Sequence, residues 1–211
     1  MTEVPTWARI GAAGVSLASL PLLLWLARRA STATTAPPAA AVTFLTLLTS
    51  VGALVWPAPL LLAGLPLLVF GVPAAAVDLR EHRLPNLLTI PLAVGAVIAL
   101  TIAALVTGQD GDWVRAVAGA GAYAGLLLVQ FLISPSTGPG DVKYAIGLGA
   151  CLGWAGWTWL LGGVIAAYGL CLLGVAAVMI ARWRRIRGPV PLGPAMYVGT
   201  VLALTAAALS P

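Results

Sequence analysis

The most restrictive feature of this 211-residue sequence is a series of long apolar stretches with hardly any charge inside them. Hydrophobic residues make up 61% of the chain and charged residues 8%, whereas about a quarter of a typical soluble domain is charged. A water-soluble core does not account for so much apolar surface, but a membrane does, because each spanning helix needs roughly 20 mostly apolar residues. We therefore expect an all-α fold, a polytopic transmembrane helical bundle.

Eight apolar segments, separated by short polar or proline-containing breaks, predict about eight spans. The shortest breaks, at Trp56-Pro57 and near Gly156, leave open whether the adjoining segments are separate spans, one bent helix or a re-entrant segment. The first segment is expected to be a retained span, since its basic residues Arg28 and Arg29 follow the apolar run, whereas a signal peptide carries its positive charge in front. The predicted spans cover 8–27, 39–56, 58–77, 87–107, 114–134, 142–156, 157–181 and 193–210.

The distribution of lysine and arginine predicts the orientation, because cytoplasmic loops are enriched in these residues. With eight spans and the N-terminus outside, only Arg9 and Arg115 of the 11 basic residues fall outside. The loops 78–86 and 135–141 then lie on the same, cytoplasmic face. The basic residues on that face are Arg28, Arg29, Arg80, Arg83, Lys143, Arg182, Arg184, Arg185 and Arg187.

Two of the six acidic residues stand directly at predicted span boundaries. Asp78 ends one apolar run and Asp141 opens another, and the predicted topology brings both to one membrane face although 141 − 78 = 63 positions separate them. Two close carboxylates share one proton, because both cannot ionise cheaply. The ionised member can activate a water for attack on a carbonyl while the protonated member donates to the carbonyl oxygen. Taken singly, each has a plainer interpretation: Asp141 as a helix cap after a glycine turn, and Asp78 as a polar helix end near headgroups.

Other chemistries find little support in the sequence. The single histidine, His82, excludes a multi-histidine metal site and disfavours a serine triad, and the two cysteines, Cys151 and Cys171, show no metal-ligand spacing. No phosphate-binding glycine motif precedes a suitable helix, so we expect no metal and no cofactor. The net charge of +5 reflects basic loops beside a membrane rather than nucleic-acid binding.

Two stretches, DLREHRLPNLLTIPL (78–92) and GPGDVKYAIGLGACLGW (138–154), resemble the two signature regions of the type IV prepilin peptidases, which are membrane aspartic proteases of the GxGD class. A third stretch, PVPLGPAMYVG (189–199), is similar to the start of that family's C-terminal helix. The residues that match the signatures are Asp78, Arg83, Pro85 and Asn86 in the first region, and Gly138, Gly140, Asp141, Val142 and Lys143 in the second.

The resemblance implies a site and a reaction. The implied catalytic dyad is Asp78 and Asp141, and the residues implied to support the motifs or bind substrate are Gly138, Gly140, Lys143, Arg83, Pro85 and Asn86. The implied enzyme lies in the bacterial cytoplasmic membrane. It cleaves the basic leader peptide of type IV pilin-like precursors from a hydrophobic helix, near the cytoplasmic face.

The resemblance covers roughly 58–210, so we expect a six-span catalytic core at 58–211 behind an N-terminal two-span region at 1–57. Many bacterial members carry a cytoplasmic methyltransferase insert after the first span, often with four cysteines. Here that loop is only RRASTATTAPP (28–38), so a short form without N-methyltransferase activity is expected. Besides precursor proteins, the expected partner is membrane lipid, contacted by the basic cluster at 182–188.

Two other functions stay open on sequence alone. A different GxGD protease, one cutting within transmembrane helices, would use the same dyad and is distinguished by where its substrate is cut. A non-enzymatic transporter or pilus-assembly scaffold would keep its solute flux or its pilus assembly after both aspartates are replaced.

Overall fold

The structure, a computed structural model, describes residues 4–33, 36–108, 110–134, 137–182 and 190–210. Within these ranges all regular secondary structure is helical, which confirms the all-α expectation. The basic residues Arg184, Arg185 and Arg187, which entered the orientation and lipid predictions, lie outside these ranges. The helices are α1 (Thr6–Ala18), α2 (Leu20–Ala30), α3 (Ala39–Ala53), α4 (Ala58–Pro66), η1 (Leu67–Gly71), α5 (Val72–Glu81), α6 (Asn86–Thr107), α7 (Asp110–Ile133), α8 (Pro139–Ala155), α9 (Trp157–Arg182) and α10 (Gly193–Leu209).

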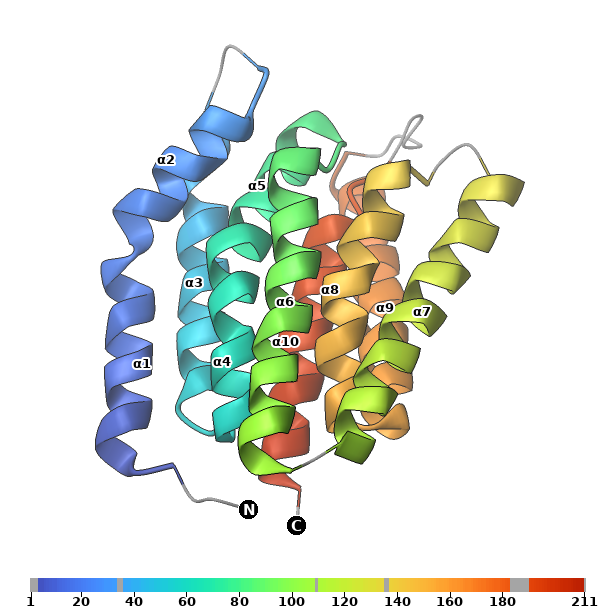
Figure 1. The fold of residues 1–211 in the computed structure, drawn as a ribbon. Helices are drawn as coiled ribbons and strands as arrows, with labels where there is room; N and C mark the ends of the chain where they lie inside the picture. Colours follow the sequence, from blue (N-terminus) through green and yellow to red (C-terminus); the bar gives the residue numbers. More distant parts are fainter. Residues whose placement is uncertain (1–3, 34–35, 109, 135–136, 183–189, 211) are drawn as a thin grey trace.

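The helices form an upright bundle in which successive elements run up and down, and both termini lie at the lower end (Figure 1). Each of the eight predicted segments overlaps one helix or one helical run. Four helical runs are long and apolar enough to cross a membrane, or five if α1 and α2 form one bent span, among the described residues. The chain is thus a multi-pass membrane protein, while the predicted total of eight spans is not confirmed.

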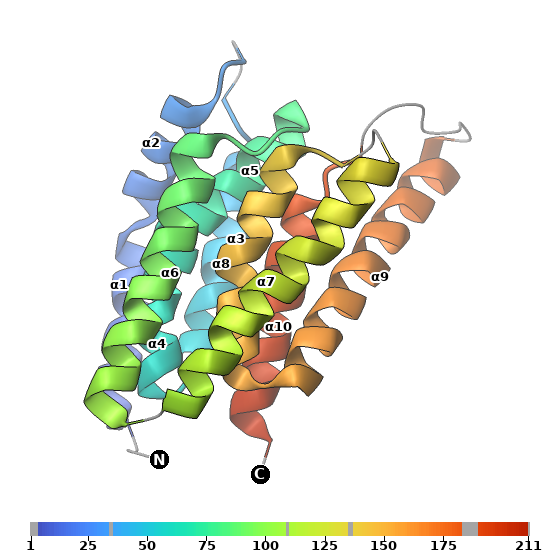
Figure 2. The same cartoon turned by 45° about the vertical axis from the view of Figure 1, so that its right-hand side comes forward.

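Both short breaks are real turns between antiparallel helices. Residues 54–57 separate α3 from α4, and Gly156 alone separates α8 from α9. Gly156 has a φ of 133°, a conformation that favours glycine. The chain therefore reverses at the lower end of the bundle at both positions (Figures 1 and 2).

The first predicted span, in contrast, is broken. The axes of α1 and α2 differ by 45° at Ser19. Pro21 lies two residues later, and because proline has no N–H it cannot continue the hydrogen-bond ladder of α1.

Close packing of α7 against α8 depends on glycines, as is common where membrane helices meet. A Cβ atom on Gly149 would lie 2.7 Å from the carbonyl oxygen of Gly119, and one on Gly153 would lie 2.6 Å from that of Arg115. The Arg115 side chain then donates to the carbonyls of Gly153 and Trp154, at 2.9 and 2.7 Å. It thereby satisfies carbonyls at the end of α8, where the helix leaves them without partners.

Helix α10 lies inside the bundle and contacts the N-terminal part of the chain. The Thr49 hydroxyl donates to the Leu45 carbonyl at 2.8 Å, so the 2.7 Å bond between Thr49 and Tyr197 is donated by the tyrosine. The buried indole of Trp56 donates to Thr205 at 3.2 Å. Helix α3 and the turn that follows it therefore share the core of the bundle.

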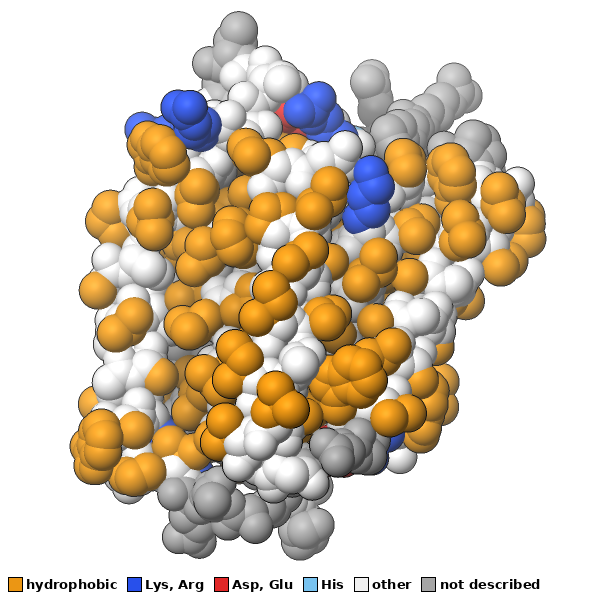
Figure 3. Space-filling view, viewed as in Figure 1, with side chains coloured by type: hydrophobic (Ala, Val, Ile, Leu, Met, Phe, Trp, Pro, Cys, Tyr) orange, Lys and Arg blue, Asp and Glu red, His pale blue; other side chains and the backbone are white. Residues whose placement is uncertain are grey.

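Basic side chains gather at one end of the bundle. Figure 3 shows an apolar belt around the middle, with Lys and Arg side chains at its upper edge. Arg28 and Arg29 lie in the last turn of α2, and Arg80 lies in the last turn of α5. The upper end is therefore the one that the sequence assigns to the cytoplasm.

Candidate active site

Asp78 lies near the upper end of α5, inside the protein. Every residue of α5 from Val72 to Asp78 is buried, and Asp78 is 4% exposed. Its carboxyl oxygen Oδ2 accepts a 2.8 Å hydrogen bond from the amide of Gly193, the first residue of α10. A helix N-terminus leaves amides without partners and carries partial positive charge, so it stabilises a carboxylate there. Asp78 is thus held by the start of α10, which lies within the stretch 189–199.

Asp141 lies in the first turn of α8, at the same end of the bundle. Its Oδ2 accepts a 2.8 Å hydrogen bond from the amide of Gly138, the residue directly before the helix. The capping interpretation of Asp141 is therefore correct as a description of its contact. One carboxyl oxygen stays without a protein partner among the contacts of the described residues, so capping leaves part of the group available.

Asp78 and Asp141 come from different helices, α5 and α8, and lie at the same end of the bundle. Within the described chain no direct hydrogen bond joins the two carboxyl groups; each accepts instead from a backbone amide. The structure therefore places the two acids at one end of the bundle, each oriented by a backbone amide.

Leu84 connects the surroundings of the two acids. A Cβ atom on Gly140 would lie 2.8 Å from the Cβ and the carbonyl oxygen of Leu84, and one on Gly193 would lie 3.2 Å from its Cδ2. Leu84 is 8% exposed, although its neighbours His82 and Arg83 face solvent. Glycine at 140 and at 193 therefore lets this side chain pack beside both aspartates.

The remaining predicted site residues separate into two groups. Lys143 donates to the side-chain oxygen of Asn86 at 2.9 Å, so these two lie together, and Pro85 caps the start of α6 beside them. Arg83, in contrast, forms a 3.1 Å ion pair with Glu81, and its side chain is 48% exposed. The structure does not bring Arg83 to the aspartates.

Tyrosine side chains are polar groups of the bundle interior that the sequence analysis did not single out. Tyr123 and Tyr144 are 2% and 0% exposed. Tyr168 donates to Gln130 of α7. The Tyr123 hydroxyl is buried and has no hydrogen-bond partner among the described residues. The sequence held one signal: the chain has four tyrosines, and all of them lie in predicted spans.

A π-helical turn, η1, lies two turns before Asp78. Pro66 directly precedes it and Pro73 lies two residues after its end, and each removes a backbone donor from the helix. The Tyr144 hydroxyl donates to the carbonyl of Gly71 in this turn, at 2.9 Å. Such π-helical insertions are frequent at functional sites, and this one joins the helix of Asp78 to the helix of Asp141.

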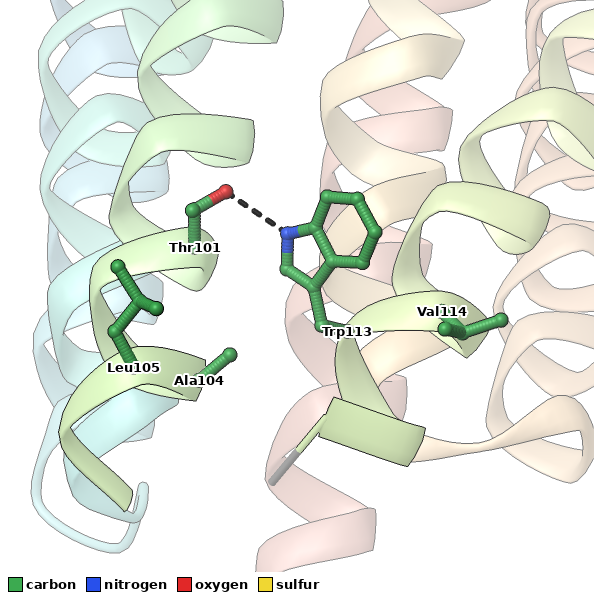
Figure 4. A pocket seen from close by; sticks show the side chains of 5 residues that line it. All are labelled: Thr101, Ala104, Leu105, Trp113 and Val114. Carbon is green, nitrogen blue, oxygen red and sulfur yellow. Dashed lines mark hydrogen bonds between the residues drawn. The ribbon is translucent and has the colours of Figure 1, made fainter. Parts of the chain in front are cut away.

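A pocket lies far from the acids, at the lower turn between α6 and α7. It encloses about 240 Å³ and is lined by Thr101, Ala104, Leu105, Trp113 and Val114. Figure 4 shows the Trp113 indole donating to the Thr101 hydroxyl, at 2.8 Å. None of these five residues is acidic or basic. Among the described residues no three His, Cys, Asp or Glu side chains are grouped as metal ligands.

Comparison with known proteins shows which family this chain resembles in sequence. A family model described as the type IV leader peptidase family matches residues 65–183. The chain is also similar to a prepilin leader peptidase/N-methyltransferase of Dickeya chrysanthemi, with 34% identity over 163 residues, which covers 72% of this chain and 53% of the relative. The chain thus spans about half the length of the curated relative it matches. No solved structure matches the chain.

Proposed function

Because the chain belongs to the type IV leader peptidase family, we propose that it is a membrane-embedded aspartic endopeptidase that removes the basic leader peptide of type IV pilin-like precursors. Asp78 and Asp141 are the proposed catalytic dyad. The observation that carries the proposal is their common location: two carboxyl groups from separate helices lie at one end of an apolar bundle, with Leu84 packed between their surroundings.

In the proposed mechanism the two carboxyls share one proton, because two close carboxylates in an apolar setting cannot both ionise cheaply. The ionised member takes a proton from a water molecule as the water attacks the scissile carbonyl, and the protonated member donates to the carbonyl oxygen. The proton gained then passes to the leaving amine. The backbone amides of Gly138 and Gly193 keep each carboxyl oriented while its other oxygen does the chemistry.

The proposed substrate suits the geometry around the dyad. The cleaved bond joins a basic leader to a hydrophobic helix, so the helix lies in the membrane while the leader stays at its surface. Asp78 lies near the end of α5 and Asp141 in the first turn of α8, at the end of the bundle where Arg28, Arg29 and Arg80 lie. We assign this end to the cytoplasm and the protein to the bacterial cytoplasmic membrane, because the positive-inside distribution favours both.

Two further features belong to the proposal. Residues 58–211 form the catalytic core, and 1–57 form an added N-terminal region. The short loop between α2 and α3 favours a peptidase without N-methyltransferase activity, in contrast to the printed name of the Dickeya relative.

Co-expression with a pilin-like precursor tests the proposal. The wild-type chain is expected to shift the precursor to the mobility of the mature protein on a gel, while Asp78→Asn and Asp141→Asn leave it unprocessed. The Asp112→Asn variant is the matched control, because this carboxylate pairs with Arg115 at the other end of the bundle. Processing by either dyad variant contradicts the dyad, and a cut within the apolar helix indicates a GxGD protease of another type.

A further inference from the structure

Glu81, three residues after Asp78, holds the loop that follows α2. Its Oε1 accepts hydrogen bonds from the Ser31 hydroxyl and from the amides of Thr32 and Ala33, the last two at 2.9 and 3.3 Å. Its Oε2 accepts from the Thr32 hydroxyl at 2.9 Å and pairs with Arg83 at 3.1 Å. We name this set of five residues the Glu81 clamp.

The clamp joins two parts of the chain that lie 48 to 50 residues apart. Ser31 to Ala33 follow α2 directly and lie outside the stretch that matches the family, 65–183. Glu81 ends α5 and lies inside that stretch. The N-terminal region is therefore bonded to the turn between α5 and α6, which contributes Leu84 to the surroundings of the aspartates.

Helix electrostatics do not explain this arrangement. The C-terminal end of a helix carries partial negative charge and disfavours a carboxylate nearby. Glu81 nevertheless lies at the end of its own helix and beside the end of α2. It is held there by hydrogen bonds from consecutive amides and hydroxyls, the kind of backbone site that binds anions.

The turn that the clamp adjoins needs external support. His82 has a left-handed backbone, with a φ of 52°, and is the one non-glycine residue with positive φ in the described chain. Such a conformation costs on the order of 1 kcal/mol in a residue other than glycine and persists only where surrounding contacts hold it. Glu81 precedes His82 and pairs with Arg83, so the clamp fixes the backbone on both sides of it.

We infer that Glu81 is a positioning residue for the peptidase reaction, and that through it the N-terminal helices α1 and α2 hold the α5–α6 turn over the dyad. The path runs from Ser31–Ala33 to Glu81, and from the turn through Leu84 to Gly140 and Gly193 beside the two acids. The role in catalysis rests on the proposed function. The role in holding the turn does not.

The test compares full-length variants purified in detergent. Glu81→Ala is expected to increase hydrogen–deuterium exchange at 82–85 and at 31–33, and to lower kcat on a precursor by about tenfold or more with KM little changed. A misplacement of about 1 Å can cost on the order of 100-fold. Glu81→Gln keeps the oxygen that accepts from 31–33 and loses the Arg83 pair. Its exchange rate at these positions and its kcat should therefore lie between those of the wild type and of Glu81→Ala.

Two comparisons separate positioning from a loss of folded protein. Asp112→Ala removes another paired carboxylate, at the opposite end of the bundle, and should change neither exchange at 82–85 nor kcat. Thr32→Val, which removes one hydroxyl of the clamp, should change both in the direction of Glu81→Ala. The inference is overturned if Glu81→Ala leaves exchange at 82–85 unchanged, or if exchange rises and kcat does not fall. A wild-type chain that cleaves no precursor contradicts the proposed function, and the exchange comparison then still decides whether the clamp holds the turn.

Discussion

The Lys143 ammonium group donates a 2.9 Å hydrogen bond to the side-chain oxygen of Asn86, which lies 57 positions earlier in the chain. Lys143 follows Asp141 in the first turns of α8, and Asn86 is the first residue of α6. The bond therefore joins the two signature regions directly. It also fixes the start of α8 relative to the turn that contains Leu84.

Breaking this bond is expected to weaken activity moderately. Lys143→Ala and Asn86→Ala should each lower kcat/KM by about threefold to tenfold, because an exposed, charge-assisted hydrogen bond contributes on the order of 1 kcal/mol. Asn86→Asp should retain activity, since a carboxylate there still accepts from Lys143. Rate measurements on the double alanine variant check the pairing. If the two residues act as a pair, its kcat/KM should equal that of either single variant. A loss equal to the product of the two single losses would contradict the pairing.

Gly140 is expected to tolerate no side chain. In Gly140→Ala the new methyl group would lie 2.8 Å from the backbone oxygen of Leu84, so either α8 or the α5–α6 turn must shift. We expect a loss of about 1–3 kcal/mol in stability, as for other overpacked sites, together with a loss of cleavage. Thermal melting and precursor processing measure the two effects.

Gly125→Ala in α7 is the matched control for that variant. No atom lies within 4 Å of the position of its Cβ, and alanine favours helix over glycine by up to about 1 kcal/mol. Its melting temperature should therefore stay the same or rise. Equal destabilisation by Gly125→Ala and Gly140→Ala would show that the Leu84 contact is not the cause.

Tyr144 and Tyr123 provide a contrasting pair of hydroxyl deletions. Tyr144→Phe removes the donor to the Gly71 carbonyl and is expected to cost about 1 kcal/mol of stability. Tyr123→Phe removes a buried hydroxyl that has no hydrogen-bond partner in the part of the chain that the structure describes, so it should leave stability unchanged or raise it. Denaturation under identical detergent conditions measures the stability of both variants. A Tyr123→Phe variant that is less stable than Tyr144→Phe would contradict these assignments.

The sequence predicts the helical class and the helix positions well, because apolar runs and proline or glycine breaks are local signals. It also predicts that Asp78 and Asp141 share one end, since this follows from counting reversals of the chain. The hydrogen-bond partners of the acidic residues, in contrast, could not be predicted. The Gly193 amide is 115 positions from Asp78, and Ser31 is 50 positions from Glu81. No periodicity encodes such pairings.

Arg83 illustrates the limit of reasoning from a motif. The resemblance implies motif support or substrate binding for it, and the structure adds a contact that no motif encodes: the side chain is 48% exposed and pairs with Glu81, while the adjacent Leu84 is buried. The broken first span has a comparable origin, since Pro21 interrupts a run whose composition alone is that of one continuous helix.

The most direct test of the central claim is mass spectrometry of both fragments released from a pilin-like precursor by the purified full-length chain. The account predicts a single cut between the basic leader and the hydrophobic helix, a new N-terminus without a methyl group, and a rate at least about 100-fold lower in Asp78→Asn and in Asp141→Asn, which is the scale of general acid–base catalysis. An undiminished rate in either variant, or a cut inside the hydrophobic helix, would contradict it.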